Sequence, residues 1–474
     1  MIKKLLAFSG VEAVARALSW SFPMVLAFIV SVEQYGAIGV FLASEALLLP
    51  LILGGFDRFI LRFGSGRSDY VENVVLIWGM IFSLGFVLLL VVITLRKLWP
   101  GMPEPLLLYI SGVALVLSIL AQSITRVNAA VARVNADSID YARHRLPFVI
   151  LRWVVGVPYI YLVDSSYSGF LYAMVYVSLA TLVVSGILSR KYFSLHNKLQ
   201  LGSLKDVFMN VVLARGKRII SFSAPYIPHS IAGSALAFSD RIMIEMFSGV
   251  EQVGNYQVSY SIGSAIVFMY AIIAVYMEPR LYKKSNSPHK DDAILIAYQK
   301  VLFLMGSMGG LVIIALVSHY ESLFFDRGYR DTSRLVIILL LSHLYHAIYL
   351  AGNYRLAREL RTSFIAISTM GAALINILLN LLLIPRYGAL GAAWATLVSY
   401  SLLSVIISSF SLKVLAGKGF GRSAFNIWIG LLLFGVIVLT SNYSSIILML
   451  IITVWSVVMA FPVLYRFCLV HVRQ

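Results

Sequence analysis

The sequence predicts an all-α polytopic membrane protein with fourteen transmembrane helices, arranged as two parallel six-helix lobes followed by two additional C-terminal helices. Three observations support this prediction. The chain of 474 residues is 60% hydrophobic and only 12% charged, which excludes an ordinary soluble protein. Long apolar runs follow one another with basic residues between them. A short phrase in the first half returns in the second.

Each apolar run has about 17–25 residues, enough for a helix to cross the roughly 30 Å hydrocarbon core of a bilayer. The runs are 5–30, 35–56, 73–95, 106–127, 146–163, 168–189, 219–247, 254–279, 294–318, 333–353, 363–384, 389–411, 424–440 and 445–465. The start, MIKKLLAF, resembles a signal peptide, but Glu12 and Arg16 interrupt its apolar run and no small-residue cleavage site follows. We therefore predict that this segment is retained as the first helix.

The basic residues indicate the topology. If Lys3 and Lys4 are cytoplasmic, 28 of the 38 Lys and Arg fall in cytoplasmic segments, 5 in external loops and 5 inside helices. This positive-inside pattern predicts that both termini are cytoplasmic. The net charge of +17 then reflects topology and anionic headgroups, so nucleic-acid binding is not needed. The single cysteine, Cys468, excludes an intramolecular disulfide, and no Cys/His cluster has metal-ligand spacing.

A repeat relates the two halves. VEQYGAIG at 32–39 returns as VEQVGNYQ at 250–257, 218 positions later, and Gly169 and Gly388 mark the turns of the sixth and twelfth helices, 219 positions apart. Glycine permits a tight turn and a close approach of helices in lipid. Because six helices per repeat is an even number, both lobes enter the membrane in the same orientation and are related by an axis along its normal.

The repeat predicts four segments along the chain. The N-lobe is 1–189 and holds helices 1–6, and a basic amphipathic cytoplasmic linker follows at 190–218. The C-lobe is 219–412 and holds helices 7–12. Helices 13 and 14 and a cytoplasmic tail occupy 413–474, outside the repeat, and are expected to be peripheral. The two lobes are expected to enclose a central path.

Three longer stretches resemble one family. They are VEQYGAIGVFLASEALLLPLILGGFDRFILRFG at 32–64, FSDRIMIEMFSGVEQVGNYQVSYSIGS at 238–264 and GAALINILLNLLLIPRYGALGAAWATLVSYSLLS at 371–404. They are similar to polysaccharide-transport flippases of the MOP superfamily, above all the Wzx-type flippases of O-antigen and other lipid-linked oligosaccharides. The resemblance extends in pattern over residues 1–415.

The resemblance implies a MATE-like, V-shaped pair of lobes in the bacterial inner membrane. It implies alternating access that moves an undecaprenyl-diphosphate-linked oligosaccharide from the cytoplasmic to the periplasmic leaflet through a cavity lined by cationic side chains. The implied partners are this glycan, anionic membrane lipids, and the polysaccharide polymerase and chain-length regulator. No cofactor is expected, although transport coupled to H⁺ or Na⁺ is compatible with the family.

Three alternatives stay open. A MATE-like multidrug or cation exporter would prefer carboxylates in its cavity, whereas Arg16 and Arg241 fall mid-span. A lipid II-type flippase also has fourteen helices, but the first helix here, SGVEAVARALSW, lacks the arginine–aspartate signature of that branch. A membrane glycosyltransferase or polymerase would have a large external loop. Because the sequence shows no P-loop, nucleophile elbow or glycosidase-like carboxylate pair, we predict that the protein is not an enzyme.

Arginines within the apolar runs are the candidate substrate-binding residues, because an intramembrane charge is costly unless it is paired or hydrated. They are Arg16, Arg126, Arg152 and Arg241. We expect them to line a cationic cavity and to bind the diphosphate or an anionic glycan. Alternatively, Arg16 forms an ion pair with Glu12, four residues earlier. Arg241 could pair with Glu245 and leave Asp240 free, or pair with Asp240 and leave Glu245 free. The other two arginines could snorkel to the inner headgroups.

Four carboxylates and one histidine are candidates for ion coupling or gating. They are Glu12, Glu45, Asp240, Glu278 and His229. Glu45 is the most isolated carboxylate within a span, and the alternative for it is a protonated packing residue. Glu278, at the cytoplasmic end of helix 8, is expected to form a gate or an interfacial salt bridge. His229 follows two prolines that break its helix, and it either titrates or bonds a freed carbonyl.

Overall fold

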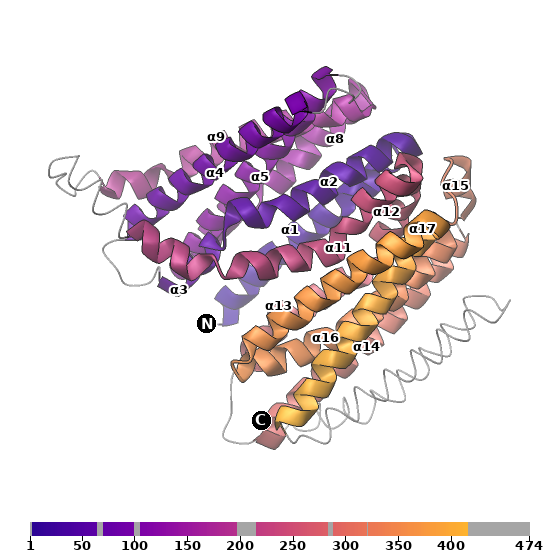
Figure 1. Ribbon diagram of the computed structural model, residues 1–474. Coiled ribbons are helices and arrows are strands. Elements are labelled where there is room, and N and C mark those ends of the chain that lie inside the picture. Colours follow the sequence, from indigo (N-terminus) through magenta and orange to yellow (C-terminus); the bar gives the residue numbers. More distant parts are fainter. Residues whose placement is uncertain are drawn as a thin grey trace. The chain divides into compact units, whose positions relative to one another are not determined.

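The computed structural model describes residues 2–63, 70–98, 105–196, 215–282, 288–319 and 321–415. These residues form helices and turns, and no strand occurs among them. The chain divides into two compact units, residues 1–238 (unit 1) and residues 239–474 (unit 2) (Figure 1).

The helices have the following bounds. The elements that lie in unit 1 are α1 (Ile2–Leu26), α2 (Val32–Leu53), α3 (Phe56–Phe63), α4 (Tyr70–Leu98), α5 (Pro105–Val134), α6 (Ser138–Arg145), α7 (Pro147–Leu151), the π-helical turn η1 (Arg152–Gly156), α8 (Val157–Leu162) and α9 (Tyr167–His196). The helix α11 (Tyr226–Ser248) runs across the boundary into unit 2. The others are α12 (Val250–Gly263), α13 (Ala265–Tyr282), α14 (Pro288–His319), α15 (Glu321–Asp326), α16 (Thr332–Arg358) and α17 (Thr362–Leu415).

The helix α5 lies at the centre of unit 1. It packs against α2, α3, α4, α6 and α9. Its side chains Ile119, Leu120, Ile124 and Val127 join apolar residues of α2, α3 and α4 in one buried core. Because α5 is fixed on several sides, its polar residues are held in defined positions within the unit.

The helix α16 has the equivalent place in unit 2. It packs against α12, α13, α14 and α17, and 78% of its most apolar stretch is buried. α5 contains the fourth of the predicted spans and α16 contains the tenth. The central helices of the two units are thus six spans apart in the predicted order, and the division into two six-helix lobes stays a prediction.

Some of the predicted spans do not correspond to one continuous helix each. The seventh is interrupted at Ala224 and Pro225, as expected for a proline that lacks an N–H group. The eighth is divided into α12 and α13 at Ser264. The eleventh and twelfth form the single element α17, which is broken at Gly388, where φ is 55° and ψ is −135°. Only glycine adopts such a conformation readily, and this explains the interruption.

Eight helices of the described residues are long and apolar enough to cross a membrane. They span 32–53, 73–91, 110–134, 138–162, 167–190, 293–317, 332–358 and 362–411. The last range contains two of the predicted spans. Helices 13 and 14, and positions 197–214 of the predicted linker, lie outside the described residues, so the count of fourteen stays a prediction.

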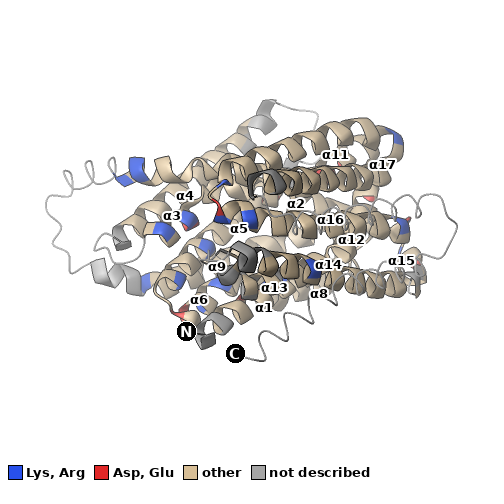
Figure 2. Cartoon of the chain, turned by 90° about the horizontal axis from the view of Figure 1, so that it is seen from below, with Lys and Arg blue, Asp and Glu red and all other residues tan. Residues whose placement is uncertain are grey.

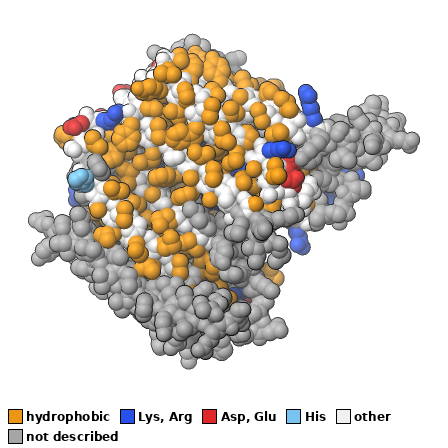
Figure 3. Space-filling model, turned by 180° about the vertical axis from the view of Figure 1, so that it is seen from behind, with side chains coloured by type: hydrophobic (Ala, Val, Ile, Leu, Met, Phe, Trp, Pro, Cys, Tyr) orange, Lys and Arg blue, Asp and Glu red, His pale blue; other side chains and the backbone are white. Residues whose placement is uncertain are grey.

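The surface of the described helices is that of a membrane protein. Large apolar side chains such as Phe82 and Phe86 on α4 and Val183 and Ile187 on α9 are exposed. Figure 3 shows a broad hydrophobic face with charged side chains at its margin. In Figure 2, Lys and Arg of unit 1 gather near the ends of helices, around α3, α5, α6 and α9. Apolar helix surfaces with basic ends match the two zones of a bilayer.

Candidate functional site

Three side chains surround Glu12 of α1. The Glu12 carboxylate accepts a hydrogen bond from Arg16 Nε at 2.9 Å, one turn later on the same helix. It also accepts bonds from Arg145 Nε at 2.9 Å and Nη2 at 3.3 Å, and from the Tyr141 hydroxyl at 2.9 Å. Tyr141 and Arg145 share one face of α6, whose first turn is capped by Asp137. We call Glu12, Arg16, Tyr141 and Arg145 the Glu12 cluster.

The Glu12 cluster is basic and partly open. The side chain of Arg16 is 50% exposed and that of Arg145 is 22% exposed. The Arg133 guanidinium lies 5.9 Å from the ring of the cluster's tyrosine. Arg126, which is exposed on α5, interacts electrostatically with both Arg145 and Glu12. Arginines therefore outnumber the glutamate, and the ion pair considered for Arg16 is present while half of its side chain stays accessible.

Arg152 and Glu45 form a second ion pair, inside unit 1. Arg152 Nη2 lies 3.0 Å from each Glu45 carboxylate oxygen, and the Ser118 hydroxyl donates to the same carboxylate. The guanidinium also lies 4.3 Å from the ring centroid of Phe148 and 5.4 Å from that of Phe22. Both charged residues are buried, so the pair joins α2, α5 and η1.

This pair corrects two expectations from the sequence. Glu45 is not isolated, and Arg152 neither snorkels to the headgroups nor lines an open cationic path, since each neutralises the other. A buried charge without a partner would be strongly destabilising. The two residues are 107 positions apart, so no local spacing reveals the contact. The role of Glu45 in ion coupling stays a prediction.

Asp240 and Arg241 of α11 form a buried pair in unit 2. Arg241 Nη1 lies 2.6 Å from Asp240 Oδ1, and Arg241 Nε donates to Gln257 Oε1 at 3.0 Å. The Tyr256 hydroxyl donates to Asp240 Oδ2 at 2.5 Å. The guanidinium lies 3.9 Å from the ring centroid of Tyr260. Three side chains of α12, those of Tyr256, Gln257 and Tyr260, thus hold the pair in place.

The structure decides between the two pairings that the sequence left open for Arg241. Helical positions suggested different faces for Asp240 and Arg241 and made Glu245 the alternative partner. Instead, the long arginine side chain folds back onto the neighbouring aspartate, and Glu245 is exposed. Arg241 is 1% exposed, so it is a buried member of a network and not an open cation. The proposed role of Asp240 in ion coupling stays a prediction.

Two histidines of α16 extend this network with aromatic contacts. The His343 ring lies 5.3 Å from the Tyr260 ring and 6.3 Å from the Tyr400 ring, and His346 lies 5.2 Å from Tyr400. No group of three His, Cys, Asp or Glu residues that could hold a metal ion occurs in the described part of the chain.

The two remaining candidates lie apart from these clusters. His229 is in the first turn of α11, and its Nδ1 makes no hydrogen bond to any described residue, so this atom does not bond a freed carbonyl. Glu278 is in α13, but its side chain lies outside the described residues. The gating roles predicted for both stay predictions.

The repeated phrases place equivalent glutamines at two turns. In unit 1, Gln34 Oε1 accepts the backbone N–H of Tyr167 at 2.5 Å, which ties the start of α2 to the start of α9. Hydrogen bonds from Ser166 hold the pKa of Asp164, in the same turn, below its usual value. In unit 2, Gln252 lies beside Gly388, whose left-handed conformation breaks α17. The glutamine of the phrase thus ties two helices together in unit 1 and lies beside a helix break in unit 2.

Sequence reasoning missed three members of these sites. Tyr141 was not considered, Arg145 was counted only among loop charges, and Ser118 lies in an apolar run. One signal was available for the first two. Asp137 before SIDYARHR is a helix N-cap pattern, and it predicts a short helix with Tyr141 and Arg145 on one face.

Comparisons with solved structures show a shared fold. A structure described as the lipid II flippase MurJ in an inward closed conformation is 16% identical and has a TM-score of 0.61, covering 98% of this chain and 100% of that chain. An inward-facing multidrug resistance MATE transporter of the MOP superfamily is 12% identical, with a TM-score of 0.62 and coverage of 88% and 96%. A MOP superfamily transporter from Pyrococcus furiosus is 15% identical, with a TM-score of 0.57 and coverage of 87% and 96%.

Sequence comparison identifies the family. No curated protein sequence shows significant similarity to this chain. The sequence model of a family described as polysaccharide biosynthesis protein matches residues 2–283, which is more than half of the 474 residues. The protein is thus a multi-pass membrane protein and not an enzyme: it belongs to the polysaccharide biosynthesis protein family and has the MOP-superfamily transporter fold that MurJ and MATE proteins share.

Proposed function

We propose that the protein is a flippase that moves an undecaprenyl-diphosphate-linked oligosaccharide, such as an O-antigen repeat unit, from the cytoplasmic to the periplasmic leaflet by alternating access. The family assignment supports a role in polysaccharide biosynthesis, and the fold supports transport. In the topology that the basic residues predict, the Glu12 cluster lies toward the cytoplasmic side of the bacterial inner membrane, where such a substrate would enter.

The observation that carries this proposal is the chemistry of the Glu12 cluster. A diphosphate is a dianion with several acceptor oxygens, and guanidinium groups bind such oxygens in pairs. Arg16 and Arg145 present guanidinium groups that remain partly exposed, with Arg126 and Arg133 nearby. Glu12 holds these groups when no substrate is present, and an entering diphosphate would replace its carboxylate.

This exchange explains why one carboxylate lies among several arginines. Without Glu12, the guanidinium groups would repel one another and lose their fixed orientation. With it, they are preorganised, and the substrate gains hydrogen bonds that are already directed. Arg152 and Arg241 take part only indirectly, because their own buried partners occupy them.

A transport assay tests the role of the cluster. The purified protein would be placed in vesicles that contain a fluorescent undecaprenyl-diphosphate-linked oligosaccharide, and a quencher outside the vesicles would report movement between leaflets. We expect Arg145→Gln and Arg16→Gln each to slow transport by at least about tenfold, because a hydrogen bond to a charged group contributes roughly 1.5–3 kcal/mol and each 1.4 kcal/mol is about tenfold. Wild-type transport by both variants would contradict the proposal.

Two further variants separate binding from folding. Glu12→Gln keeps an amide oxygen that can accept a hydrogen bond from an arginine but removes the charge that the substrate must replace, so we expect it to slow transport less than Arg145→Gln does. A purely structural cluster would lose as much with Glu12→Gln as with Arg145→Gln. Arg190→Gln, at an exposed position in α9, removes the same charge elsewhere and should transport like the wild type.

A lipid II-type flippase is the second candidate. The observation in its favour is that the likeness to MurJ extends over 98% of this chain, against 88% for the MATE transporter. The same vesicles distinguish the two candidates when they contain labelled lipid II in place of the oligosaccharide. Transport of lipid II alone would favour this second candidate over the first.

A further inference from the structure

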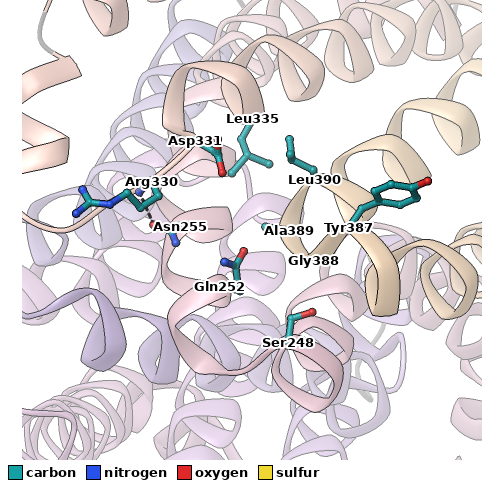
Figure 4. Close-up of a pocket in the computed structure, with 10 residues that line it drawn as sticks. All are labelled: Ser248, Gln252, Asn255, Arg330, Asp331, Leu335, Tyr387, Gly388, Ala389 and Leu390. Atoms are coloured by element: carbon teal, nitrogen blue, oxygen red, sulfur yellow. Dashed lines mark hydrogen bonds between the residues drawn. The ribbon is translucent and has the colours of Figure 1, made fainter.

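A pocket of about 310 Å³ lies in unit 2 (Figure 4). It is formed where α11 ends, where α12 and α16 begin and where α17 is interrupted. Ligand sites in proteins have volumes of roughly 300–1,000 Å³, so this one is of a size for about one or two sugar rings. It lies outside the ion pairs described above.

One side of the pocket is polar. The Asn255 Oδ1 atom accepts the backbone N–H of Arg330 at 2.8 Å, which fixes the amide and leaves its Nδ2 as a donor. The side chains of Gln252 and Asp331 make no hydrogen bond to any described residue. Figure 4 shows these three side chains around the same space. Together, the two amides and the carboxylate offer both hydrogen-bond donors and hydrogen-bond acceptors.

The backbone makes the Asp331 carboxylate available to a ligand. Asp331 is the residue before α16, with φ 55° and ψ 19° in the left-handed region. An aspartate at this position normally accepts an N–H group of the first helical turn, but here it makes no such bond. A left-handed conformation at a residue other than glycine is uncommon and tends to occur at functional sites.

The other side of the pocket is apolar. Leu335 of α16 and Ala389 and Leu390 of α17 form this wall, and Tyr387, which is 61% exposed, lies at the rim. A sugar ring has hydroxyl groups around its edge and C–H groups on its faces. The polar side of the pocket can provide hydrogen-bond partners for the hydroxyl groups, which need them when buried. The apolar side can pack against the C–H face of the ring.

The charge of the pocket excludes an anionic ligand such as a diphosphate. Arg330 Nη1 donates to the Phe325 carbonyl at 3.1 Å, and its guanidinium stacks 3.9 Å from the centroid of the Phe325 ring. In Figure 4 this side chain points away from the pocket. The Asp331 carboxylate, which faces the pocket, would repel an anion. A neutral, hydroxyl-rich ligand remains.

The equivalent turn of unit 1 provides an internal comparison. There the glutamine of the repeated phrase, Gln34, is engaged by the Tyr167 N–H, whereas in unit 2 Gln252 keeps its amide for other partners. Gly388 lies directly beside this glutamine. A Cβ atom at Gly388 would lie 3.3 Å from Gln252 Oε1, and φ at this glycine is 55°.

We propose that this pocket binds a neutral saccharide of one or two rings, through hydrogen bonds from Gln252, Asn255 and Asp331 and apolar contact with Leu335 and Leu390. The inference rests on the proposed function, because the saccharide is part of the transported glycan. In the topology that the basic residues predict, the pocket is on the external side and receives the sugar after it has crossed.

The test is direct binding of free sugars to the purified full-length protein in a detergent without a sugar headgroup. The probes are the methyl glycosides of glucose, galactose, mannose and N-acetylglucosamine, with maltose, cellobiose and inorganic phosphate, observed by saturation-transfer NMR. We expect at least one sugar to bind and phosphate not to bind at this site. Gln252→Leu and Asp331→Asn should each weaken that binding by about tenfold, the effect of one lost hydrogen bond to a buried polar ligand.

Gln34→Leu is the matched control, because it makes the same change at the equivalent turn of unit 1. It should leave sugar binding unchanged. The proposal is overturned if no sugar binds the wild-type protein, if both pocket variants bind like the wild type, or if the control weakens binding as much as they do. Vesicle transport is measured separately: transport without sugar binding contradicts only the pocket, and sugar binding without transport contradicts only the flippase.

Discussion

Unit 1 and unit 2 hold their buried arginines in different ways. In unit 1, Arg152 reaches Glu45 across 107 positions, so an ion pair joins two helices. In unit 2, Arg241 bonds its neighbour Asp240 on the same helix, and neutral side chains of α12 make the contact between helices. The fold therefore tolerates a buried arginine in either unit. The contact between helices is an ion pair in unit 1, whereas in unit 2 uncharged side chains of α12 form hydrogen bonds with the charged pair of α11.

The turns at the repeated phrases differ in a related way. In unit 1, Gln34 accepts a hydrogen bond from the backbone N–H of Tyr167, whereas in unit 2 the equivalent Gln252 lines a pocket. The glutamine of the phrase therefore makes different contacts at the two turns, and in unit 2 it lies beside the left-handed Gly388.

Breaking the ion pair of unit 1 should have the largest effect. Arg152→Met leaves Glu45 buried without a cation, so we expect the free energy of unfolding to fall by roughly 3–5 kcal/mol. Denaturant unfolding of the purified protein in detergent measures this change. The double variant Glu45→Gln, Arg152→Met should recover most of the loss, and equal stability of the single and double variants would show that the pair is unimportant.

Removing the hydrogen bond between Tyr256 and Asp240 in unit 2 should have the next largest effect on the free energy of unfolding. Tyr256→Phe removes the hydroxyl that donates to the Asp240 carboxylate, and we expect a loss of roughly 1.5–3 kcal/mol, as for hydrogen bonds to charged groups. The same unfolding measurement applies. Tyr226→Phe, at an exposed tyrosine of α11, should change the free energy of unfolding by less than about 0.5 kcal/mol. Equal effects of the two variants would argue against the network.

Gly169 and Gly388 should both resist replacement by alanine, but for different physical reasons. A Cβ atom at Gly169 would overlap the Asp164 carbonyl oxygen, so Gly169→Ala should cost roughly 1–3 kcal/mol. Gly388→Ala should cost about 1–2 kcal/mol, because alanine disfavours the left-handed conformation. Thermal unfolding of each variant measures both losses. Gly79→Ala, where a Cβ meets nothing within 4 Å, should stabilise α4, and destabilisation there would undermine the comparison.

The glutamines of the repeated phrase should give the smallest effect and the sharpest contrast. Gln34→Leu removes the bond to the Tyr167 N–H and should lower the free energy of unfolding by roughly 0.5–1.5 kcal/mol. Gln252→Leu removes no bond to a described residue and should leave stability nearly unchanged. Stability curves of the two variants, recorded under the same conditions, check the difference, and equal losses would mean that the turns are equivalent.

The sequence was informative where local chemistry decides the structure. Apolar length predicted the helices, Pro225 predicted an interruption, and the glycine at 388 marked a turn, because each of these depends on the chain's own stereochemistry. The family resemblance correctly indicated a polysaccharide biosynthesis protein with a MOP-superfamily fold.

The partners of charged residues were harder to predict. Glu45 and Arg152 meet only through tertiary packing, which no spacing in the sequence records. The partner of Arg241 stayed open for a different reason, because helical geometry fixes the direction of Cβ and not the end of a long, flexible side chain. Arg145 joins the Glu12 cluster because a short capped helix places it there, although its sequence context resembles a loop.

The π-helical turn η1 has one residue more than an α-helical turn of similar rise. The Val157 N–H donates to the Arg152 carbonyl, five positions earlier, and within this wide turn Arg152 reaches α2 while the Trp153 indole donates to the Leu18 carbonyl of α1 at 2.9 Å. Because the extra residue is accommodated within one wide turn, deleting one residue from 154–156 would leave a regular helix whose two flanks keep nearly the same rotational register. The extra residue therefore changes where the side chains of this turn point, with Arg152 toward α2 and Trp153 toward α1, without rotating the two ends of the span against each other.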